Sequence, residues 1–552
     1  MEDCISSAGE YGKYQKIIIF ISITTGSIPF ILSISYAYLT KMPSFLAKDS
    51  LGQYTIETEF DNEIFCSNDN NDYIKDKKNS VDNFTYEFDL YCNKEFFIPL
   101  YSTVFFLGGL LGSIFFAPIP DRYGRKTIFQ ILQIFTLFLQ LNLLLAIGPW
   151  HLVFVYFFSG VATYTFGMSS IIIAEYLPRN ITNIVMSITN GCFPLCGILV
   201  GIFFCIFNNK KVLFLITTLI QLISTYFTIK YFKESPIWLF SMKLKEKFYQ
   251  NMKEISVINN KEIEFQEYLR NNKDNLDKLM SKNNNSEEGL NKEENENIKT
   301  YTLKEIFGFN SQRDNLIKSF ISWFLIPSVF YGIILNLAYF KGNFYIICFC
   351  SFLGEISGEL SSGFLAGLFG RIKIMCLNCF ISGISIIIFT FANSEFINYL
   401  CIYLATMGVA SCFNVLFIHT PELYPTPIRG MICGYTYLLS RMGPMVVSPI
   451  TANFGIFNTN ILFAFLCIFS GIIISKLPET LGKELLNEIP ELEGIGILVD
   501  STFGKLSSKR YLLSEKLFKT SFAGHDPISL RQIGAKSFAQ FTNIGSGIFS
   551  RK

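Results

Sequence analysis

The sequence is poor in the residues from which catalytic and metal sites are built. Its three His stand far apart, and its 14 Cys are mostly scattered singly inside apolar stretches. No Cys-x-x-Cys motif is accompanied by a second one that could complete a metal site. A metal site is therefore not expected. No nucleophile is accompanied by a base and an orienting group, so an enzyme is not expected either. The formal net charge is only +2, which gives no reason to expect a nucleic acid as a partner.

Apolar residues, by contrast, are abundant. Half of the residues are hydrophobic and 16% are aromatic, which is more than a soluble domain usually needs. About twelve apolar runs have the roughly 20-residue length that a helix needs to cross a bilayer. They lie at roughly 16–39, 96–119, 127–148, 150–174, 184–207, 211–232, 315–339, 344–367, 373–392, 396–418, 430–452 and 459–476. The first run lacks a clear cleavage site and is interpreted as a permanent span. The sequence predicts an all-α integral membrane protein with twelve transmembrane helices.

Three short motifs recur at a nearly constant spacing. The pairs and their offsets are Gly124 and Gly370 (370 − 124 = 246), Glu175 and Glu422 (422 − 175 = 247), and Glu234 and Glu479 (479 − 234 = 245). Their common order and spacing predict two six-helix pseudo-repeats. Internal repeats in a polytopic membrane protein are typical of transporters, whose binding site lies between the repeats near the middle of the membrane.

Basic residues predict the orientation of the chain, because short cytoplasmic loops are rich in Lys and Arg. One side would hold Arg122, Arg125, Lys126, Arg179, Lys233, Arg371, Lys373, Arg429 and Lys476. Both termini are therefore expected in the cytoplasm. The predicted organisation is a cytoplasmic N-terminus (1–15), a first half (16–240) with an insert at 42–95 on the opposite side, a cytoplasmic linker (241–314) that is partly helical at its start, a second half (315–482) and a cytoplasmic tail (483–552).

The insert at 42–95 carries two features of secreted segments. Cys66 and Cys92 could form a disulfide in an oxidising compartment or remain two free thiols. Asn83-Phe-Thr85 is a sequon, so Asn83 is a candidate for glycosylation. The insert favours the plasma membrane over an internal membrane, although both stay open.

Taken together, the motifs resemble the major facilitator superfamily and, within it, the group of organic cation, organic anion and carnitine transporters (solute carrier 22-like). The resemblance covers nearly all of residues 9–489. It rests on Gly9-Glu-Tyr-Gly-Lys-Tyr-Gln15, the loop Asp121–Lys126, Glu234-Ser-Pro-Ile-Trp-Leu239, Glu422-Leu-Tyr-Pro-Thr-Pro-Ile-Arg429 and Pro478-Glu-Thr-Leu-Gly482. The resemblance implies a twelve-helix carrier that works by alternating access.

The resemblance also implies which residues control the gate next to the signature loops. The matching positions are Asp121, Arg122, Gly124, Arg125, Glu175, Arg371, Glu422 and Arg429. Three departures remove partners from the usual gating salt bridges. Thr182 and Ile237 replace Arg residues of the pattern, and Gly367 replaces an Asp. These departures put the usual locking mechanism in doubt but not the fold.

Three charged residues lie deep inside predicted spans. Glu355 and Glu359 are four residues apart in one span, and Arg441 lies in another. A charge at a helix centre costs roughly 2.5–3.5 kcal/mol on insertion scales, so these side chains should face the protein interior. Counted along the helices at about 1.5 Å per residue, Glu355 and Arg441 lie at the same depth.

This level is the candidate substrate site. Resemblance to the family places Arg441 where anion and carnitine carriers have Arg, and Glu355 at the Glu of the eighth helix. Tyr437 lies four residues before Arg441, and Tyr331 and Asn336 resemble the family's aromatic pocket helix. The alternative interpretation is a structural ion pair between Glu355 and Arg441. Glu359 could carry a proton, attract a cationic group or simply face a water-filled vestibule.

The sequence thus predicts a secondary active or facilitative transporter, not an enzyme, that binds a small organic anion or a zwitterion such as a carnitine-like compound. It would work as a monomer in a lipid bilayer, without a cofactor other than a coupling ion, H⁺ or Na⁺. One alternative is an organic cation transporter that uses Glu355 and Glu359. The other is a sensor or scaffold that kept the fold and lost transport.

Overall fold

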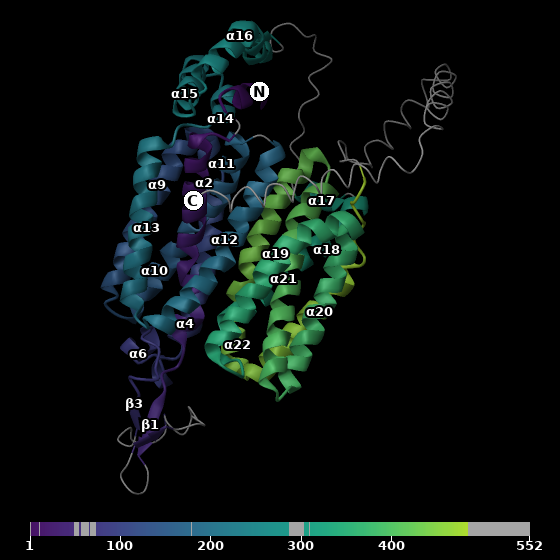
Figure 1. The fold of residues 1–552 in the computed structure, drawn as a ribbon. Helices are drawn as coiled ribbons and strands as arrows, with labels where there is room; N and C mark the ends of the chain where they lie inside the picture. Colours follow the sequence, from purple (N-terminus) through teal and green to yellow (C-terminus); the bar gives the residue numbers. More distant parts are fainter. Residues whose placement is uncertain are drawn as a thin grey trace, which may run out of the picture. The chain divides into compact units, whose positions relative to one another are not determined.

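The computed structural model of the chain is almost entirely helical (Figure 1). It describes residues 2–9, 11–48, 54–56, 66, 73–177, 179–285, 303–308 and 310–483. The tail beyond residue 483 and the linker segment 286–302 lie outside the described residues, so the predictions made for them stay predictions.

The first half contains six spans. Their elements are α2 (Lys13–Ser27), η1 (Ile28–Phe30), α3 (Ile31–Ile34) and α4 (Tyr36–Thr40); α7 (Phe97–Phe116) with the short α8 (Ile119–Tyr123); α9 (Arg125–Leu145); α10 (Pro149–Ala162) and α11 (Tyr164–Tyr176); α12 (Arg179–Ile206); and α13 (Lys210–Tyr231). The first span is interrupted near Pro29, because proline cannot supply a backbone N–H to the helix. The fourth span changes direction at Thr163, between α10 and α11.

The second half repeats this arrangement. Its elements are α18 (Asn310–Asn336) with η4 (Leu337–Tyr339), α19 (Phe344–Phe369), α20 (Arg371–Phe391), α21 (Glu395–Leu423) and α22 (Thr426–Ile474), preceded by the short α17 (Leu303–Gly308). Gly455 has a non-helical backbone (φ 68°, ψ 159°), so α22 is two spans joined at a kink. The seventh span begins at Asn310, five residues earlier than expected.

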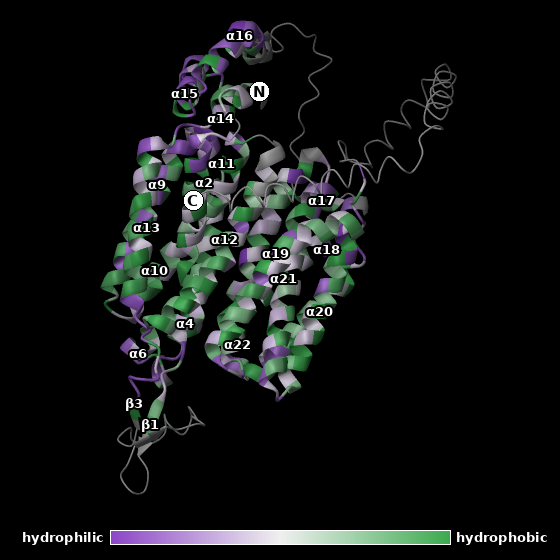
Figure 2. Ribbon diagram, in the orientation of Figure 1, coloured by the Kyte–Doolittle hydropathy of each residue, from purple (hydrophilic) through white to green (hydrophobic). Residues whose placement is uncertain are grey.

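Hydropathy separates the spans from the rest of the chain (Figure 2). Eleven helical segments of the described residues are long and apolar enough to cross a membrane, and the longest of them, Ile428–Ile474, contains the kink at Gly455. The predicted twelve-span fold in two halves is therefore confirmed. Many large apolar side chains on these helices are exposed, as expected for surfaces that contact lipid.

Local capping explains where several spans begin. Asn209 accepts hydrogen bonds from the backbone N–H groups of Lys211 and Val212 at the start of α13. Asn343 does the same for the first residues of α19. An Asn side chain in this position satisfies N–H groups that the helix itself leaves without a partner.

The insert between the first two spans contains a small antiparallel sheet. Strand β1 (Phe45–Lys48) pairs with both β2 (Tyr54–Ile56) and β3 (Tyr73–Lys75), and α6 (Phe84–Phe88) and η3 (Cys92–Lys94) follow. Cys66 and Cys92 form a disulfide. Lys210, at the start of α13, is buried and forms an ion pair with Asp82 at 2.5 Å. This ion pair holds the insert against the start of α13.

Asn83 conflicts with the predicted glycosylation. Its side chain is 0% exposed, and its Nδ2 donates hydrogen bonds to the carbonyl oxygens of Tyr38 at 2.9 Å and Lys41 at 2.7 Å. Its Oδ1 accepts from the backbone N–H of Tyr86 and caps α6. A glycan on Nδ2 would break both of these bonds, so this prediction is corrected: the buried Asn83 is a structural residue in this fold.

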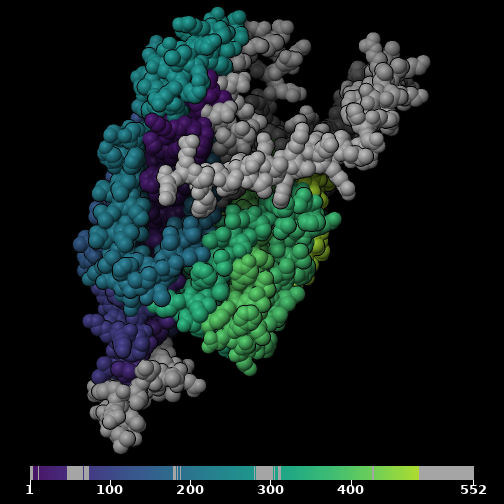
Figure 3. All heavy atoms as spheres, viewed as in Figure 1, coloured from purple at the N-terminus to yellow at the C-terminus, as the bar shows by residue number. Residues whose placement is uncertain are grey.

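The first part of the linker forms a helical bundle with the N-terminus. It consists of α14 (Pro236–Ser241), α15 (Lys245–Ile258), α16 (Glu262–Asn285) and α1 (Glu2–Ser7). These helices share one apolar core, and Figure 3 shows the teal atoms of α14–α16 gathered at one end of the first half. Asn259 binds three N-terminal groups: the N–H of Tyr14, the carbonyl of Ala8 and the side chain of Gln15.

Candidate functional site: charged turns and a central cavity

The charged loop of the first half is closed by a half-buried arginine. Arg125 forms ion pairs with Asp121 at 3.0 Å and Glu175 at 3.1 Å, and it donates to the carbonyl oxygen of Pro120 at 3.3 Å. These contacts tie the turn between α8 and α9 to the end of α11. We call the membrane side that holds this turn the motif end, and the opposite side, which holds the insert, the insert end.

The second half repeats the arrangement at the predicted offsets. Arg371 binds Glu422 at 3.1 Å and donates to the carbonyl oxygen of Ala366 at 2.8 Å, so Ala366 takes the place of Pro120. Gly367 leaves Arg371 without the acid that Asp121 supplies in the first half. Each half therefore keeps one Arg–Glu pair in spite of the missing partners, and each pair joins residues of the same half.

A second carboxylate holds the backbone of each turn. Glu234 accepts the backbone N–H of Arg125 at 2.7 Å and that of Lys126 at 3.1 Å. Glu479 accepts the N–H of Arg371 at 2.9 Å and that of Ile372 at 3.0 Å. Both acids belong to the motifs that recur in the sequence, but their role could not be predicted from it, because their partners are backbone groups rather than side chains.

Burial and hydrogen bonding act on Glu479 in opposite directions. Burial raises the pKa of its carboxyl group, but hydrogen bonds from backbone N–H groups of residues 481, 371, 372 and 480 outweigh burial and hold the pKa below its ordinary value. The ionised carboxylate is therefore the form that stabilises the turn.

Glycine is required in both turns. Gly124 has a φ of +96° and Gly370 a φ of +106°, a backbone region that favours glycine. A Cβ on Gly124 would lie 2.3 Å from Oε2 of Glu234, and one on Gly370 would lie 2.6 Å from Oε2 of Glu479. Of the other predicted gating residues, Arg122 is exposed, and Arg429 donates to the carbonyl oxygen of Tyr424 at 3.1 Å.

The two halves touch near the insert end. The Ser448 hydroxyl group contacts that of Ser102 and donates to the carbonyl oxygen of Pro99 at 3.4 Å. The ammonium group of Lys41 lies 4.1 Å from the ring centroid of Phe344, which also packs against Tyr38. These contacts join α7 to α22, and α4 to α19, so they close the insert end.

Between the halves lies a cavity of about 220 Å³. Its walls come from the first, fourth and fifth spans of the first half and from the seventh, eighth, tenth and eleventh spans of the second. The lining residues are Phe30, Phe166, Ser170, Asn190, Phe193, Phe330, Tyr331, Glu355, Glu359, Ala410, Phe413, Asn414, Phe417, Tyr437, Ser440 and Arg441. The cavity thus combines an aromatic wall with one base and two acids, a lining suited to an amphipathic ion.

Arg441 is held by aromatic side chains and by none of the described acids. Its side chain is 5% exposed; Nη2 donates to the Tyr437 hydroxyl at 2.8 Å and Nη1 to the Tyr331 hydroxyl at 3.4 Å. Its Cζ lies 5.4 Å from the ring centroid of Phe30, within cation–π range. Its Nε has no hydrogen-bond partner among the described residues. The guanidinium group therefore keeps donor capacity for an anion.

Glu355 and Glu359 also line the cavity, and neither forms an ion pair with a base of the described residues. Glu355 is 1% exposed, and neither of its carboxylate oxygens has a hydrogen-bond partner among the described residues. Oε2 of Glu359 is likewise buried without a partner. The alternative interpretation of a structural Glu355–Arg441 pair is not supported, because the described residues contain no such ion pair within 4 Å.

The cavity unites five of the six predicted substrate-site residues. Asn336 is the exception: it donates to the carbonyl oxygen of Gly332 at 2.8 Å and to Thr451 at 3.4 Å, and it is absent from the cavity lining. Its amide group serves the end of α18, so its predicted role is corrected. Sequence reasoning missed Phe30 and Phe193, whose residue type is too common in this chain to mark a site.

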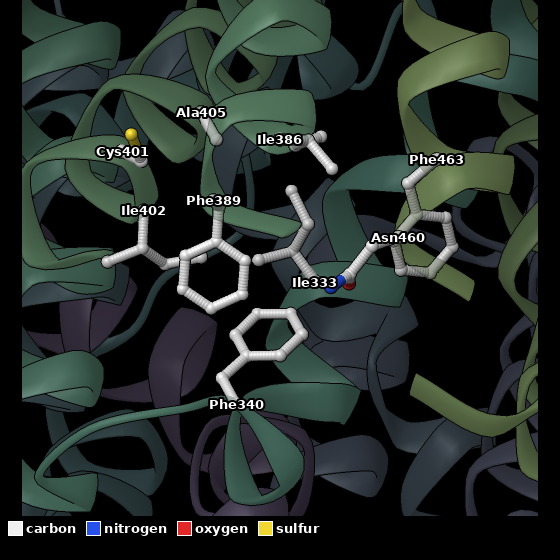
Figure 4. A pocket seen from close by; sticks show the side chains of 9 residues that line it. All are labelled: Ile333, Phe340, Ile386, Phe389, Cys401, Ile402, Ala405, Asn460 and Phe463. Carbon is white, nitrogen blue, oxygen red and sulfur yellow. The ribbon is translucent and has the colours of Figure 1, made fainter. Parts of the chain in front are cut away.

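A second void lies within the second half and is a packing defect. It has a volume of about 10 Å³ and is enclosed mainly by apolar side chains such as Ile333, Phe340 and Phe389, with Asn460 at one side (Figure 4). This volume is about that of one water probe, so the void cannot hold an organic substrate.

Comparison with known proteins shows which family this chain resembles. The Major Facilitator Superfamily model matches residues 89–272. The solved inward open conformation of the xylose transporter XylE from E. coli aligns with a TM-score of 0.58 at 13% identity, over 87% of this chain and 98% of that one. The chain is therefore similar to the major facilitator superfamily, in sequence over residues 89–272 and in fold over most of its length. The relatives that it matches are transporters, and its described residues contain eleven helical segments that are long and apolar enough to cross a membrane.

The chain is also similar to proteins of the solute carrier 22 family and to related organic ion transporters. It is 26% identical to solute carrier family 22 member 6 of Danio rerio over 448 residues, which are 78% of this chain and 74% of that protein. It is 23% identical to an organic cation transporter-like protein of Drosophila melanogaster, over 90% of this chain and 93% of that one. It is also 25% identical to the human organic cation/carnitine transporter 2, over 74% and 71%.

Proposed function

We propose that this chain is a carrier of the major facilitator type that moves small organic anions, or zwitterions with a carboxylate such as carnitine-like compounds, across a membrane by alternating access. Arg441 binds the carboxylate, and the rings of Phe30, Tyr331 and Tyr437 contact the apolar part of the substrate. The observation that supports this assignment is a buried guanidinium group that lines a cavity without an acidic partner among the described residues. An unpaired buried charge is costly, and a bound anion would compensate it.

Alternating access is supported by the position of the contacts between the halves. The halves close over the cavity at the insert end, through Lys41, Phe344, Ser102 and Ser448. The ion pairs of the motif end each stay within one half. Opening the insert end and joining the motif ends would expose the cavity to the other side of the membrane. We place the motif end and both termini in the cytoplasm, and the protein as a monomer in the plasma membrane.

The test is uptake of a labelled panel of organic anions, zwitterions and cations by cells that express the chain. We expect the wild-type protein to accumulate an anion or zwitterion. Arg441→Ala should raise its KM at least tenfold, because a hydrogen bond to a charged group contributes about 1.5–3 kcal/mol. Asn453→Ala, on the exposed side of the same helix, is the matched control. Uptake of cations alone, unchanged by Arg441→Ala, would overturn this assignment.

The second candidate function is transport of organic cations. It is favoured by Glu355 and Glu359, whose oxygens face the cavity without a cation among the described residues. Arg441→Asp distinguishes the two functions: loss of anion uptake with gain of cation uptake places the substrate at Arg441. A third possibility is a sensor that binds ligand without moving it. Ligand-dependent flux in proteoliposomes would exclude it.

A further inference from the structure

The acids Glu355 and Glu359 have no part in binding a carboxylate at Arg441, and their position needs a reason of its own. They are four residues apart on α19, so their Cβ atoms are neighbours on one helix face, about 5–6 Å apart. Both line the cavity. Two negative charges this close would repel each other and would also repel an anionic substrate.

Neither carboxyl group has the partners that a buried negative charge requires. Three of their four oxygens are buried without a hydrogen-bond partner among the described residues, and no ion pair joins either acid to a described base. The nearby amide group of Asn414 donates instead to the backbone carbonyl of Glu359 and to Ser362. A buried acid in such surroundings takes up a proton rather than staying ionised.

The surrounding elements add no cation that could replace the proton. In the cavity, the other charged or titratable groups are Arg441, Tyr331 and Tyr437, and the arginine is bound by the two tyrosines. Away from the motif end, the elements packed against α19 carry Cys192, Cys196 and Cys205 (α12), Cys376 and Cys379 (α20), Glu395, Tyr399, Cys401, Tyr403 and Cys412 (α21) and Tyr339 (η4), none of which is cationic. Lys373 of α20 is exposed at the motif end. Arg371 and His419 lie at the motif end, where they bind Glu422 and the carbonyl oxygen of Pro478.

We propose that Glu355 and Glu359 form a proton site that couples substrate transport to proton movement. This inference rests on the proposed function. A proton from the side that the cavity faces adds to a carboxylate oxygen of the pair, forming an O–H bond. It crosses as part of the carboxylic acid and leaves to water on the other side, where that O–H bond breaks. One proton and one carboxylate then move in the same direction, so the transport of a monoanion carries no net charge.

The two acids differ in their access to water, so we assign them different roles in proton transfer. Glu355 is the deeper and fully buried, whereas Glu359 is half-buried and lies one turn closer to the motif end. Glu359 is therefore the group that exchanges its proton with the cavity. Glu355 shares that proton and keeps it within the pair.

The test uses the purified full-length chain in proteoliposomes, with labelled hippurate as the probe. Hippurate has an aromatic ring and one carboxylate, which match the cavity. An inward proton gradient should drive hippurate accumulation several-fold above the level at equal pH, and a membrane potential imposed with potassium and valinomycin should leave the rate unchanged. Glu359→Gln should abolish gradient-driven accumulation of hippurate.

The same variant should keep the exchange of internal for external hippurate, since exchange needs no net proton transfer. Glu264→Gln, on the exposed face of α16, is the matched control.

The outcomes separate this inference from the proposed function. If the wild-type chain exchanges no hippurate, the substrate assignment fails, and the proton coupling fails with it. If it exchanges hippurate but accumulation ignores the proton gradient, only the proton site is overturned. If Glu359→Gln leaves gradient-driven hippurate uptake intact but abolishes uptake of carnitine, the acids bind the cationic group of zwitterions, and the proton site is again overturned. Retained exchange in Glu359→Gln also shows that the variant is folded.

Discussion

Tyr437 and Arg441 lie one helical turn apart on α22, and the tyrosine hydroxyl accepts a hydrogen bond from the guanidinium group at 2.8 Å. The tyrosine ring also lies under the guanidinium group, with 5.1 Å from Cζ to the ring centroid. One side chain therefore fixes the arginine both by a hydrogen bond and by stacking. This orients the remaining donors toward the cavity.

Removing that hydroxyl group should weaken substrate binding. The hydroxyl group orients Arg441 and does not itself bind the carboxylate, so only part of the energy of this charged hydrogen bond is lost from substrate binding. We therefore expect Tyr437→Phe to raise the KM for a transported carboxylate roughly two- to tenfold, with little change in maximal rate. The ring stays, so stacking on Arg441 is kept. Uptake kinetics measure the effect, with Tyr435→Phe on the exposed face as control. A lower KM would contradict this prediction, because it would mean that the hydroxyl group competes with the substrate.

The contact between the N-terminus and α15 should be disrupted by a single methyl group. A Cβ on Gly12 would lie 2.2 Å from Cγ of Asn259, so Gly12→Ala must displace that side chain and its bonds to Tyr14, Ala8 and Gln15. We expect a loss of roughly 1–3 kcal/mol in the free energy of unfolding, seen as a lower Tm of the purified protein.

A double-mutant cycle provides the control for this contact. In an Asn259→Ala background, Gly12→Ala should cost far less than it does alone, because the displaced side chain is already gone. Gly430→Ala, where an added Cβ meets nothing within 4 Å, should leave the Tm nearly unchanged. Additive effects of the two substitutions would show that they act at separate places.

Acid should loosen the turn of the second half. The pKa of Glu479 is lower in the folded chain than its ordinary value, so its contribution to stability is complete above that ordinary value and is lost as the pH falls through the folded-state pKa. The measurement is thermal unfolding from neutral pH down through this acidic range. At neutral pH, Glu479→Gln should be less stable than wild type. The difference should shrink toward zero at the acid end. A difference independent of pH would contradict the prediction, and Glu395→Gln, at the exposed start of α21, serves as control.

Asn83 should carry no glycan in the folded protein. Digestion with an endoglycosidase should leave its electrophoretic mobility unchanged, since the side-chain nitrogen is buried and hydrogen-bonded. Asn83→Ala should lower the free energy of unfolding by roughly 1–3 kcal/mol, because two backbone carbonyl groups and the start of α6 lose their partner. A shift in mobility that Asn83→Gln abolishes would restore the sequon.

The sequence predicts the fold well because its signal is local. An apolar run of membrane length specifies a span by itself, and a repeated motif at a constant offset specifies the two halves. Glu355, Glu359, Arg441 and Tyr437 could be placed at one site for a related reason. Spacing along a helix determines both the depth of a residue and the face on which it lies.

Contacts between distant segments could not be predicted in this way. Asn259 binds Ala8 across 251 residues, and no periodic pattern links the two. The sequon at Asn83 is a local pattern, but its burial depends on Tyr38 and Lys41 at the end of the first span. Phe30 lies against Arg441 because the first and eleventh spans meet at the cavity, a property of the assembled helices and not of either segment alone.

The turns held by Glu234 and Glu479 bear on how the two halves could diverge after duplication. Both acids accept hydrogen bonds from backbone N–H groups. Glu234 accepts the N–H of Lys126, and Glu479 accepts the N–H of Ile372, the residue at the equivalent position of the second half. A cation and an aliphatic residue thus occupy the same position without changing the turn. The side chain at such a position does not take part in the contact, whereas the acid and the glycine next to it do. We expect the two copies to differ most at these permissive positions and least at the acid that binds the main chain.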